Sequence, residues 1–323
     1  MSLNTIPLNK RHGLPIATYP GLKITGAKVS DIVTNPRAQL YAQGALHERY
    51  RSPFVLSAMD LSAEAEAFGC AVLMSDTEVP TVTGRLITSL EQAKKLVVPQ
   101  PGDKRTAVYI EAVRLLTELP GEPFVLAGCI APFSLVARLV GVGEAMEYTI
   151  TKPGMMHTLL EKCAVFLVNY LKLFRAAGAR GVIMADPVAG LLSPRSLSTF
   201  SSVYVRHIAI EVCGDDFDIL LHNCAAKLSH LSAIRETGLK TFHFGVPMDI
   251  VEALGKITPD VVLCGNLDPA AVFVRLPPDD VTARAKGLLA ATAGYRNFAL
   301  SSGCDVPPDA PLASLDAFYR ALD

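Results

Sequence analysis

The sequence lacks an excess of charge of either sign, because 30 Lys and Arg residues balance 31 Asp and Glu residues in a chain of 323. A surface that binds nucleic acid through its phosphates needs a basic excess, so nucleic acid is not an expected partner. No run approaches the roughly 20 uninterrupted apolar residues of a membrane span. The opening stretch MSLNTIPLNKRHG has no apolar signal core. These absences predict a cytoplasmic protein without membrane contact.

Two other classes of motif are missing. The seven cysteines are scattered, and most lie in apolar runs such as CAVLM and VVLCGN, so they fit a reducing compartment rather than a secreted disulfide framework. No G-x-G-x-x-G stretch opens a helix, which gives little support to an open dinucleotide-binding sheet. Neither a disulfide scaffold nor a dinucleotide site is therefore expected.

From Pro53 onward, short apolar runs alternate with amphipathic segments. Strands buried on both faces and separated by helices indicate a parallel sheet. Seven or eight such units in a chain of this length favour an α/β fold of the (β/α)8 TIM-barrel type. We expect one domain, 1–323, with residues 1–50 as an additional N-terminal helical cover. The predicted strands are 54–59, 123–129, 180–186, 217–223, 240–245, 260–266 and 297–302, and the main predicted helices are 106–119, 157–178, 197–212, 227–238, 249–256 and 281–294.

Polar and thiol residues end six of the predicted strands. In such barrels the chemistry lies at the C-terminal ends of the strands, because the loops there converge over the barrel mouth. A shared pocket is the simplest hypothesis, although polar residues also end ordinary strands. The candidates are Asp60, Asp186, His222 with Cys224, His243, Asn266 with Asp268, and Cys304.

The stretch His222-Asn223-Cys224 has two interpretations. Residues two apart on an extended backbone point to one face, so the imidazole and the thiol can converge on one ion. Cys304, in SSGCDVPP, adds a second thiol, and one imidazole with two thiolates is a set that zinc accepts with one position left open. Alternatively, both cysteines are small buried apolar residues. The spacing alone leaves both possibilities open, and Cys264 is the other cysteine near a strand end.

Four stretches together resemble the uroporphyrinogen decarboxylase superfamily. Within it the chain is similar to the corrinoid:thiol methyltransferases, of the methylcobalamin:coenzyme M type, because HNC followed much later by SSGC matches the zinc motif of that branch. The resemblance runs from about Ile32 to the C-terminus, and it implies a TIM barrel. The four stretches are DLSAEAEAFGC (60–70), APFSLVARLVG (131–141), MADPVAGLLSP (184–194) and CGNLDP (264–269).

The resemblance implies Zn²⁺ held by His222, Cys224 and Cys304, with a small thiol in the fourth position. The zinc-bound thiolate would attack the methyl group of methylcobalamin or another methyl-corrinoid, which implies a corrinoid protein as partner. Coenzyme M, homocysteine and other small thiols all stay open as acceptors, and so does the oligomeric state.

Other residues have looser implied roles. Asp60 and Asp186 are candidate catalytic residues, and Asn266 and Asp268 either contact the cofactor or hold their own turn. A partner for the His222 ring could come from the segment of Asp60, which also contains Glu64 and Glu66; the alternative is that these two acids only decorate a helix. Some relatives place a carboxylate after the strand that follows His-x-Cys. This chain has His243 there, either as a fourth ligand or as a core histidine.

The decarboxylase branch gives a contrasting expectation. Those enzymes need no metal, and they carry an arginine-rich N-terminal stretch and a histidine in a Gly-His-Gly context. Here the corresponding stretches are KRHGLPIATYPGL and Gly303-Cys304-Asp305, and only Asp60 matches the aspartate that orients the decarboxylase substrate. Uroporphyrinogen decarboxylation is therefore the second hypothesis. A barrel that binds a corrinoid or tetrapyrrole without catalysis is the third.

Overall fold

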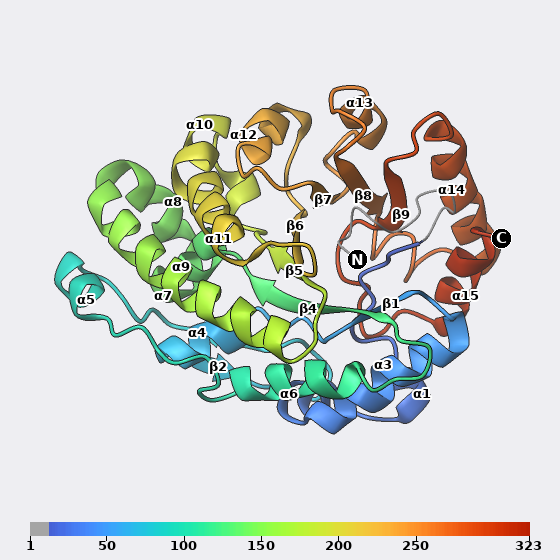
Figure 1. Ribbon diagram of the computed structural model, residues 1–323, viewed down its shortest axis with the longest axis horizontal. Helices are drawn as coiled ribbons and strands as arrows, with labels where there is room; N and C mark the ends of the chain where they lie inside the picture. Colours follow the sequence, from blue (N-terminus) through green and yellow to red (C-terminus); the bar gives the residue numbers. More distant parts are fainter. Residues whose placement is uncertain (1–12) are drawn as a thin grey trace.

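Seven parallel strands form one curved sheet in the computed structural model, which describes residues 13–323. The strands follow one another in chain order, and each pairs in parallel with the next (Figure 1). All seven strands predicted from the sequence are present, because each predicted run is buried on both faces. They are β1 Phe54–Leu56, β4 Phe124–Ile130, β5 Gly181–Ala185, β6 Asp218–Asn223, β7 Thr241–Phe244, β8 Val262–Leu267 and β9 Phe298–Ser302.

Helices form an outer ring around this sheet (Figure 1). The three that fall in the expected N-terminal cover are α1 Leu22–Thr25, α2 Val29–Thr34 and α3 Pro36–Tyr50; residues 1–12 of that cover lie outside the described part of the chain. The others are α4 Ala63–Phe68, α5 Leu90–Lys95, α6 Thr106–Leu116, α7 Pro132–Val140, α8 Val142–Thr151, α9 Pro153–Ala176, α10 Pro194–Leu197, α11 Val203–Val212, α12 Leu231–Arg235, α13 Ile250–Leu254, α14 Pro278–Ala291 and α15 Leu312–Arg320. No helix between residues 13 and 323 is long and apolar enough to span a bilayer.

An extended N-terminal segment lies along the last strand, β9. The backbone N–H of Leu14 donates to the carbonyl of Leu300 at 2.9 Å, and the side chains of Leu14 and Ile16 share one buried cluster with Phe54 and Leu56 of β1. The segment thus fills the space between the first and last strands of the sheet. The predicted α/β fold of the TIM-barrel type is confirmed, with seven paired parallel strands among residues 13–323.

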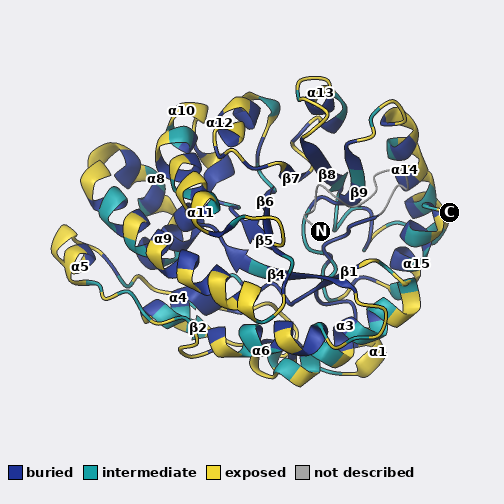
Figure 2. Ribbon diagram, in the orientation of Figure 1, coloured by how far each residue is buried: buried dark blue, intermediate teal, exposed yellow. Residues whose placement is uncertain are grey.

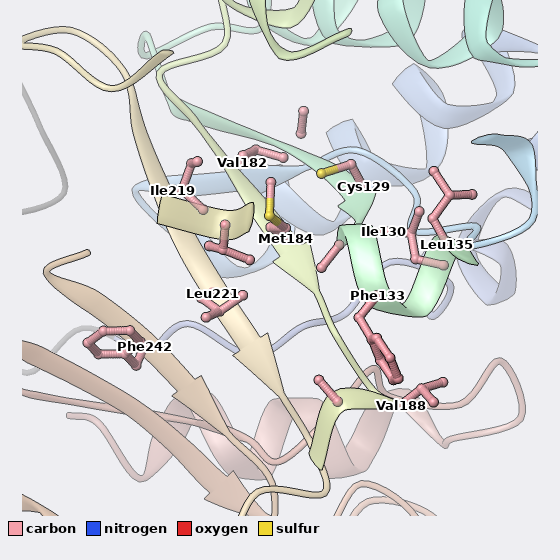
Figure 3. Close-up of a cluster of buried hydrophobic side chains, with 14 of the residues drawn as sticks. Cys129, Ile130, Phe133, Leu135, Val182, Met184, Val188, Ile219, Leu221 and Phe242 are labelled. Carbon is pink, nitrogen blue, oxygen red and sulfur yellow. The ribbon is translucent and has the colours of Figure 1, made fainter. Parts of the chain in front are cut away.

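Alternation along each strand divides the core into two layers. Leu220 of β6 belongs to the cluster inside the barrel, whereas Ile219 and Leu221 belong to the larger cluster between the sheet and the helices. Figure 3 shows part of this outer layer, and Figure 2 shows that the strands of the parallel sheet are mostly buried. Because side chains two apart share a face, strand parity decides which polar residues point into the barrel.

Two local features differ from the sequence expectation. A short antiparallel hairpin, β2 Ala71–Leu73 with β3 Thr81–Thr83, lies between β1 and β4 in the chain. Its residues are half-buried or exposed, so it has no buried apolar run that would identify it. The predicted helix 197–212 is interrupted by a π-helical turn, Ser198–Ser202, between α10 and α11.

Candidate metal centre at the end of strand β6

His222 points into the barrel near the C-terminal end of β6. It lies two residues after the inward-facing Leu220, and its own side chain is 2% exposed. The strand register fixes the position of His222 along the barrel axis, since His222 is paired with Ala185 on β5 and with His243 on β7. The imidazole is therefore held by strand geometry rather than by a flexible loop.

Cys224 and Cys304 reach the same place from two different loops. Cys224 lies one residue beyond β6, and Cys304 lies two residues beyond β9. A Cβ on Gly245 would lie 2.1 Å from the carbonyl oxygen of Cys224, and one on Gly303 would lie 3.1 Å from the carbonyl oxygen of Leu267. Only glycine permits the first of these approaches. The two glycines thus allow the loops to pack closely enough to bring both thiols beside His222.

His222, Cys224 and Cys304 each offer one ligand atom, and these atoms all lie within 4.8 Å of one another. A tetrahedral zinc with Zn–S bonds of about 2.3 Å and Zn–N bonds of about 2.1 Å needs ligand atoms roughly 3.5–3.8 Å apart, and the 4.8 Å upper limit on their spacing allows such an arrangement. His222 is buried whereas both cysteines are half-buried, so the accessible side of the cluster is its sulfur side.

The contact between the two thiols shifts their pKa values in opposite directions. The hydrogen bond from Cys304 holds the pKa of Cys224 below its usual value, and the same contact, together with burial, raises the pKa of Cys304. One thiolate is thus present more readily than in an isolated cysteine, which is the form that binds metal.

His243 lies beside this cluster and not within it. Its Nδ1 is 2.8 Å from Nδ1 of His222, and its Nε2 is 2.7 Å from Oγ of Ser301. Both ring nitrogens are therefore engaged, and the structure does not bring His243 into the ligand set. Burial, reinforced by the neighbouring His222, holds the pKa of His243 well below its usual value, so the ring is neutral.

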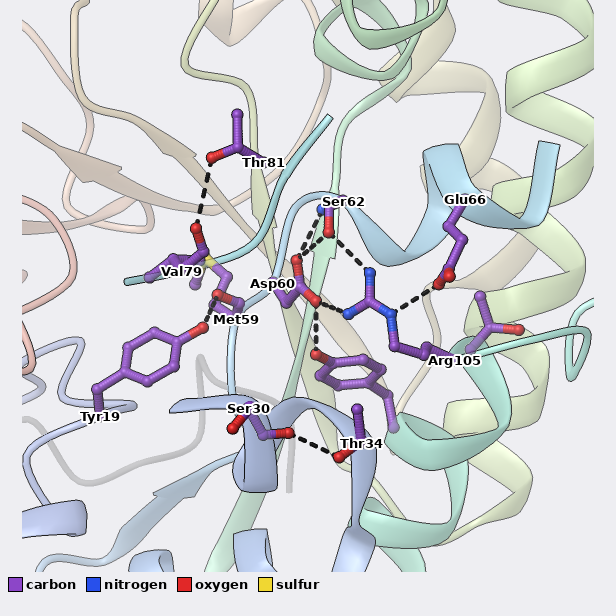
Figure 4. A network of polar contacts seen from close by, with 12 residues as sticks. Tyr19, Ser30, Thr34, Met59, Asp60, Ser62, Glu66, Val79, Thr81 and Arg105 are labelled. Carbon is purple, nitrogen blue, oxygen red and sulfur yellow. Dashed lines mark hydrogen bonds and ion pairs between the residues drawn. The ribbon is translucent and has the colours of Figure 1, made fainter. Parts of the chain in front are cut away.

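Asp60 anchors a buried polar network at the end of β1 (Figure 4). Its Oδ1 accepts from the backbone N–H and the hydroxyl of Ser62, and its Oδ2 accepts from Arg105 and from the hydroxyl of Tyr109. Arg105 also donates to Glu66 at 2.7 Å. Both carboxylate oxygens of Asp60 are thus occupied, and the partner of the His222 ring comes from β7 and not from this segment. Arg105 lies 45 positions from Asp60, and nothing in the sequence pairs the two.

Asp186 faces away from the barrel interior. It follows Ala185, which points inward, so its carboxylate turns toward the helices. There it accepts from the backbone N–H of Ser134 at 3.1 Å, from the hydroxyl of Ser134 at 2.6 Å and from the hydroxyl of Ser201. Burial raises its pKa. The carboxylate of Asp186 is not among the clustered ligand atoms, although its charge opposes the lowering of the pKa of Cys224. Its hydrogen bonds tie β5 to α7 and to the π-helical turn.

Asn266 and Asp268 hold the backbone that surrounds them. The amide of Asn266 donates to the carbonyls of Gly245 at 3.0 Å and Met248 at 2.7 Å. Asp268 Oδ1 accepts from the N–H groups of Ala270 at 2.9 Å and Ala271 at 2.7 Å. Asn266 therefore fixes the loop after β7, whose Gly245 contacts Cys224, whereas Asp268 holds its own turn.

Glu64 is a buried acid whose Oε2 has no hydrogen-bond partner among the described residues. Its Oε1 accepts from the backbone N–H of Ile130 at 3.0 Å. Burial raises its pKa from 4.5 to about 7, with Asp60 adding to the rise and Arg105 opposing it. The folded protein thus binds the proton of the Glu64 carboxyl group more tightly than the unfolded chain does.

That raised pKa gives a pH-dependent prediction for Glu64→Gln. The stability contributed by protonated Glu64 is complete below about pH 4.5 and is lost as the pH rises through about 7. Between pH 5 and pH 8 we expect wild type to lose about 2–3 kcal/mol of unfolding free energy relative to the variant. Urea denaturation of both proteins at several pH values measures this difference. Parallel curves would show that Glu64 ionises as it does in the unfolded chain.

Comparison with known proteins places the whole fold in one family. The family model described as uroporphyrinogen decarboxylase (URO-D) matches residues 16–323. A methylcobamide:CoM methyltransferase MtbA from Methanosarcina acetivorans is 28% identical over 272 residues, which cover 83% of this chain and 77% of that protein. A uroporphyrinogen decarboxylase from Psychromonas ingrahamii is 27% identical over 275 residues, covering 81% and 77%.

The solved structures agree with this similarity. A methyltransferase from Methanosarcina mazei superposes with a TM-score of 0.89 at 25% sequence identity, covering 99% of this chain and 96% of that one. The predicted resemblance to the superfamily, and within it to the methyltransferases, is confirmed. The decarboxylase and methyltransferase relatives have similar sequence identities to this chain. Overall similarity therefore does not distinguish the two activities, and the residues of the site must do so.

Proposed function

Because the chain belongs to the uroporphyrinogen decarboxylase family, we propose that it transfers a methyl group from a methyl-Co(III) corrinoid to a small thiol. The observation that carries the proposal is the cluster of His222, Cys224 and Cys304, whose ligand atoms lie within 4.8 Å of one another. The printed activity of the MtbA relative, a methylcobamide:CoM methyltransferase, supports the same reaction class.

The three residues fit zinc in both chemistry and geometry. One imidazole and two thiolates are ligands that zinc prefers, and three protein ligands leave the fourth position of a catalytic site. The half-buried cysteines form the side that a substrate can reach, whereas the buried His222 closes the opposite side. When bound, zinc would lower the pKa of a thiol in its open position, so that the sulfur reacts as a thiolate near neutral pH.

The reaction that follows is a nucleophilic displacement at carbon. The substrate sulfur forms a bond to the methyl carbon, the cobalt–carbon bond breaks with both electrons remaining on cobalt, and Co(III) becomes Co(I). The thiol proton passes to solvent. Strand β6 and the loops after β6 and β9 position the sulfur-binding side, and such positioning contributes several kcal/mol when two reactants are held in line.

We assign Asp60 and Asp186 to positioning within this proposal. The oxygens of Asp60 are filled by Ser62, Arg105 and Tyr109, and those of Asp186 by serines that lie outside the barrel. Within residues 13–323, no hydrogen bond links either carboxylate to the side chains of His222, Cys224 or Cys304. A corrinoid protein is the proposed methyl donor, with methylcobalamin as its small-molecule substitute in assays.

Uroporphyrinogen decarboxylation is the second candidate function. Decarboxylase relatives are 26–27% identical, and the family resemblance matches Asp60 to the aspartate that orients the decarboxylase substrate. Against it stands Cys304, whose thiol lies beside Cys224 and His222 in a loop where the decarboxylases carry histidine. Decarboxylation needs no metal, so metal dependence separates the two candidates.

The test is a methylcobalamin demethylation assay across a panel of thiols that includes coenzyme M and homocysteine. We expect thiol-dependent formation of Co(I) that stops after chelator treatment and returns when zinc is restored. The same preparation should leave uroporphyrinogen unchanged. Decarboxylation by the metal-free protein, with no demethylation by any thiol, would replace the first candidate with the second.

A further inference from the structure

A chain of three hydrogen bonds leads from the backbone of the N-terminal segment to the ring of His222. Ser301 Oγ contacts the carbonyl oxygen of Leu14, His243 Nε2 lies 2.7 Å from Ser301 Oγ, and His243 Nδ1 lies 2.8 Å from His222 Nδ1. His243, Ser301 and Leu14 are all buried. We call these three residues and His222 the relay.

The direction of each hydrogen bond in the relay follows from its first member. A carbonyl oxygen can only accept, so the single proton of the Ser301 hydroxyl lies toward Leu14. The Ser301 oxygen must then accept from His243, which places a proton on Nε2 of that ring. This step uses only the chemistry of the donors and acceptors.

The remaining step decides which nitrogen of His222 is free. No carboxylate bonds to His243 among the described residues, and the ring is 0% exposed, so it carries one proton only. Its Nδ1 is therefore an acceptor, and the proton between the two rings belongs to Nδ1 of His222. The lone pair of His222 lies on Nε2, which is the form that a metal requires.

We infer that His243 and Ser301 are positioning residues that fix the tautomer and the orientation of His222, with the carbonyl of Leu14 setting the direction of the relay. The role in metal binding rests on the proposed function, whereas the tautomers follow from the hydrogen bonds alone and do not depend on metal. A metal-bound histidine usually donates its second N–H to a carboxylate or a carbonyl. Here a second histidine takes that place, and the docked N-terminal segment becomes part of the site.

The first test measures tautomers in the metal-free wild type. Long-range ¹H–¹⁵N correlation spectra of histidine-labelled protein distinguish a ring protonated at Nδ1 from one protonated at Nε2, and His243→Asn assigns the signals. We expect His222 protonated at Nδ1 and His243 at Nε2. His243 protonated at Nδ1, or His222 at Nε2, overturns the relay whether or not the protein binds zinc.

The second test measures zinc affinity by competition with a chelator. His243→Phe removes the acceptor for His222, so we expect affinity to fall about 10–100-fold. His243→Asn keeps an oxygen near the position of Nδ1 and should stay within a few-fold of wild type. His157→Phe, which alters a histidine stacked on Phe200 between the outer helices, is the matched control and should leave affinity unchanged.

The outcomes separate the relay from the proposed function. If wild type binds zinc and His243→Phe binds it equally well, the positioning role fails while the proposed function stands. If wild type binds no zinc, the proposed function fails, and the tautomer spectra alone decide whether the relay exists.

Discussion

Cys304→Ala should bind zinc at least about 100-fold more weakly than wild type and lose thiol-dependent demethylation of methylcobalamin. The physical reason is that the substitution removes a ligand itself, whereas loss of an outer hydrogen-bond partner already costs about 10–100-fold. Metal analysis of protein purified under reducing conditions should give about one zinc per chain for wild type and little for the variant. Demethylation by Cys304→Ala should match that of chelator-treated wild type.

Cys264→Ala is the matched control for that substitution. Cys264 was expected near a strand end, but it lies inside strand β8, is 2% exposed within the cluster inside the barrel and is absent from the group of ligand atoms. We expect wild-type zinc content and activity from this variant. Equal zinc loss from both variants would mean that the metal is not held by Cys304.

Asp60→Asn should destabilise the protein by about 3–5 kcal/mol, because it removes the charged partner of a buried guanidinium. The side chains of Asp60 and Arg105 are 0% and 11% exposed, so solvent cannot replace the lost carboxylate easily. Glu66 remains as a second partner of Arg105, which places the expected loss near the lower end of that range. Urea denaturation at neutral pH measures the change in unfolding free energy.

Asp316→Asn provides a control with the same contacts at the surface. Asp316 also accepts from an arginine and a tyrosine, Arg49 and Tyr50, but the side chains of Arg49 and Asp316 are 44% and 26% exposed. Exposed pairs contribute at most about 1 kcal/mol, so this variant should stay close to wild type. If the two variants lose the same stability, burial does not strengthen the Asp60 network.

The strands could be predicted from local patterns, whereas the set of His222, Cys224 and Cys304 followed from the family resemblance. Each buried strand leaves an apolar run, and His222 and Cys224 are adjacent enough in sequence to share a face. The short hairpin of β2 and β3 escaped prediction because its three-residue strands face solvent. The docked N-terminal segment also escaped prediction, since its pairing with β9 joins residues 286 positions apart, from Leu14 to Leu300.

The partners of the candidate residues could not be read from the sequence for a different reason. The direction of Asp186 depends on strand parity beyond the end of β5, and the environment of Asp60 depends on Arg105 of a distant helix. The inward direction of Ser301 follows from strand alternation. Ala299 packs against the interior cluster, so Ser301, two residues later, also points into the barrel, three residues before Cys304. The sequence left His243 open as a fourth ligand, and the structure places its Nδ1 2.8 Å from that of the candidate ligand His222.

The most direct measurement of the central claim is zinc X-ray absorption on the purified protein, with and without a thiol substrate. We expect a first shell of two sulfurs at about 2.3 Å and one imidazole in the free protein. Addition of coenzyme M or another accepted thiol should add a third sulfur, as the open position fills. A zinc shell without sulfur, or one that does not change at saturating thiol, would contradict the assignment of His222, Cys224 and Cys304 as a thiol-activating centre.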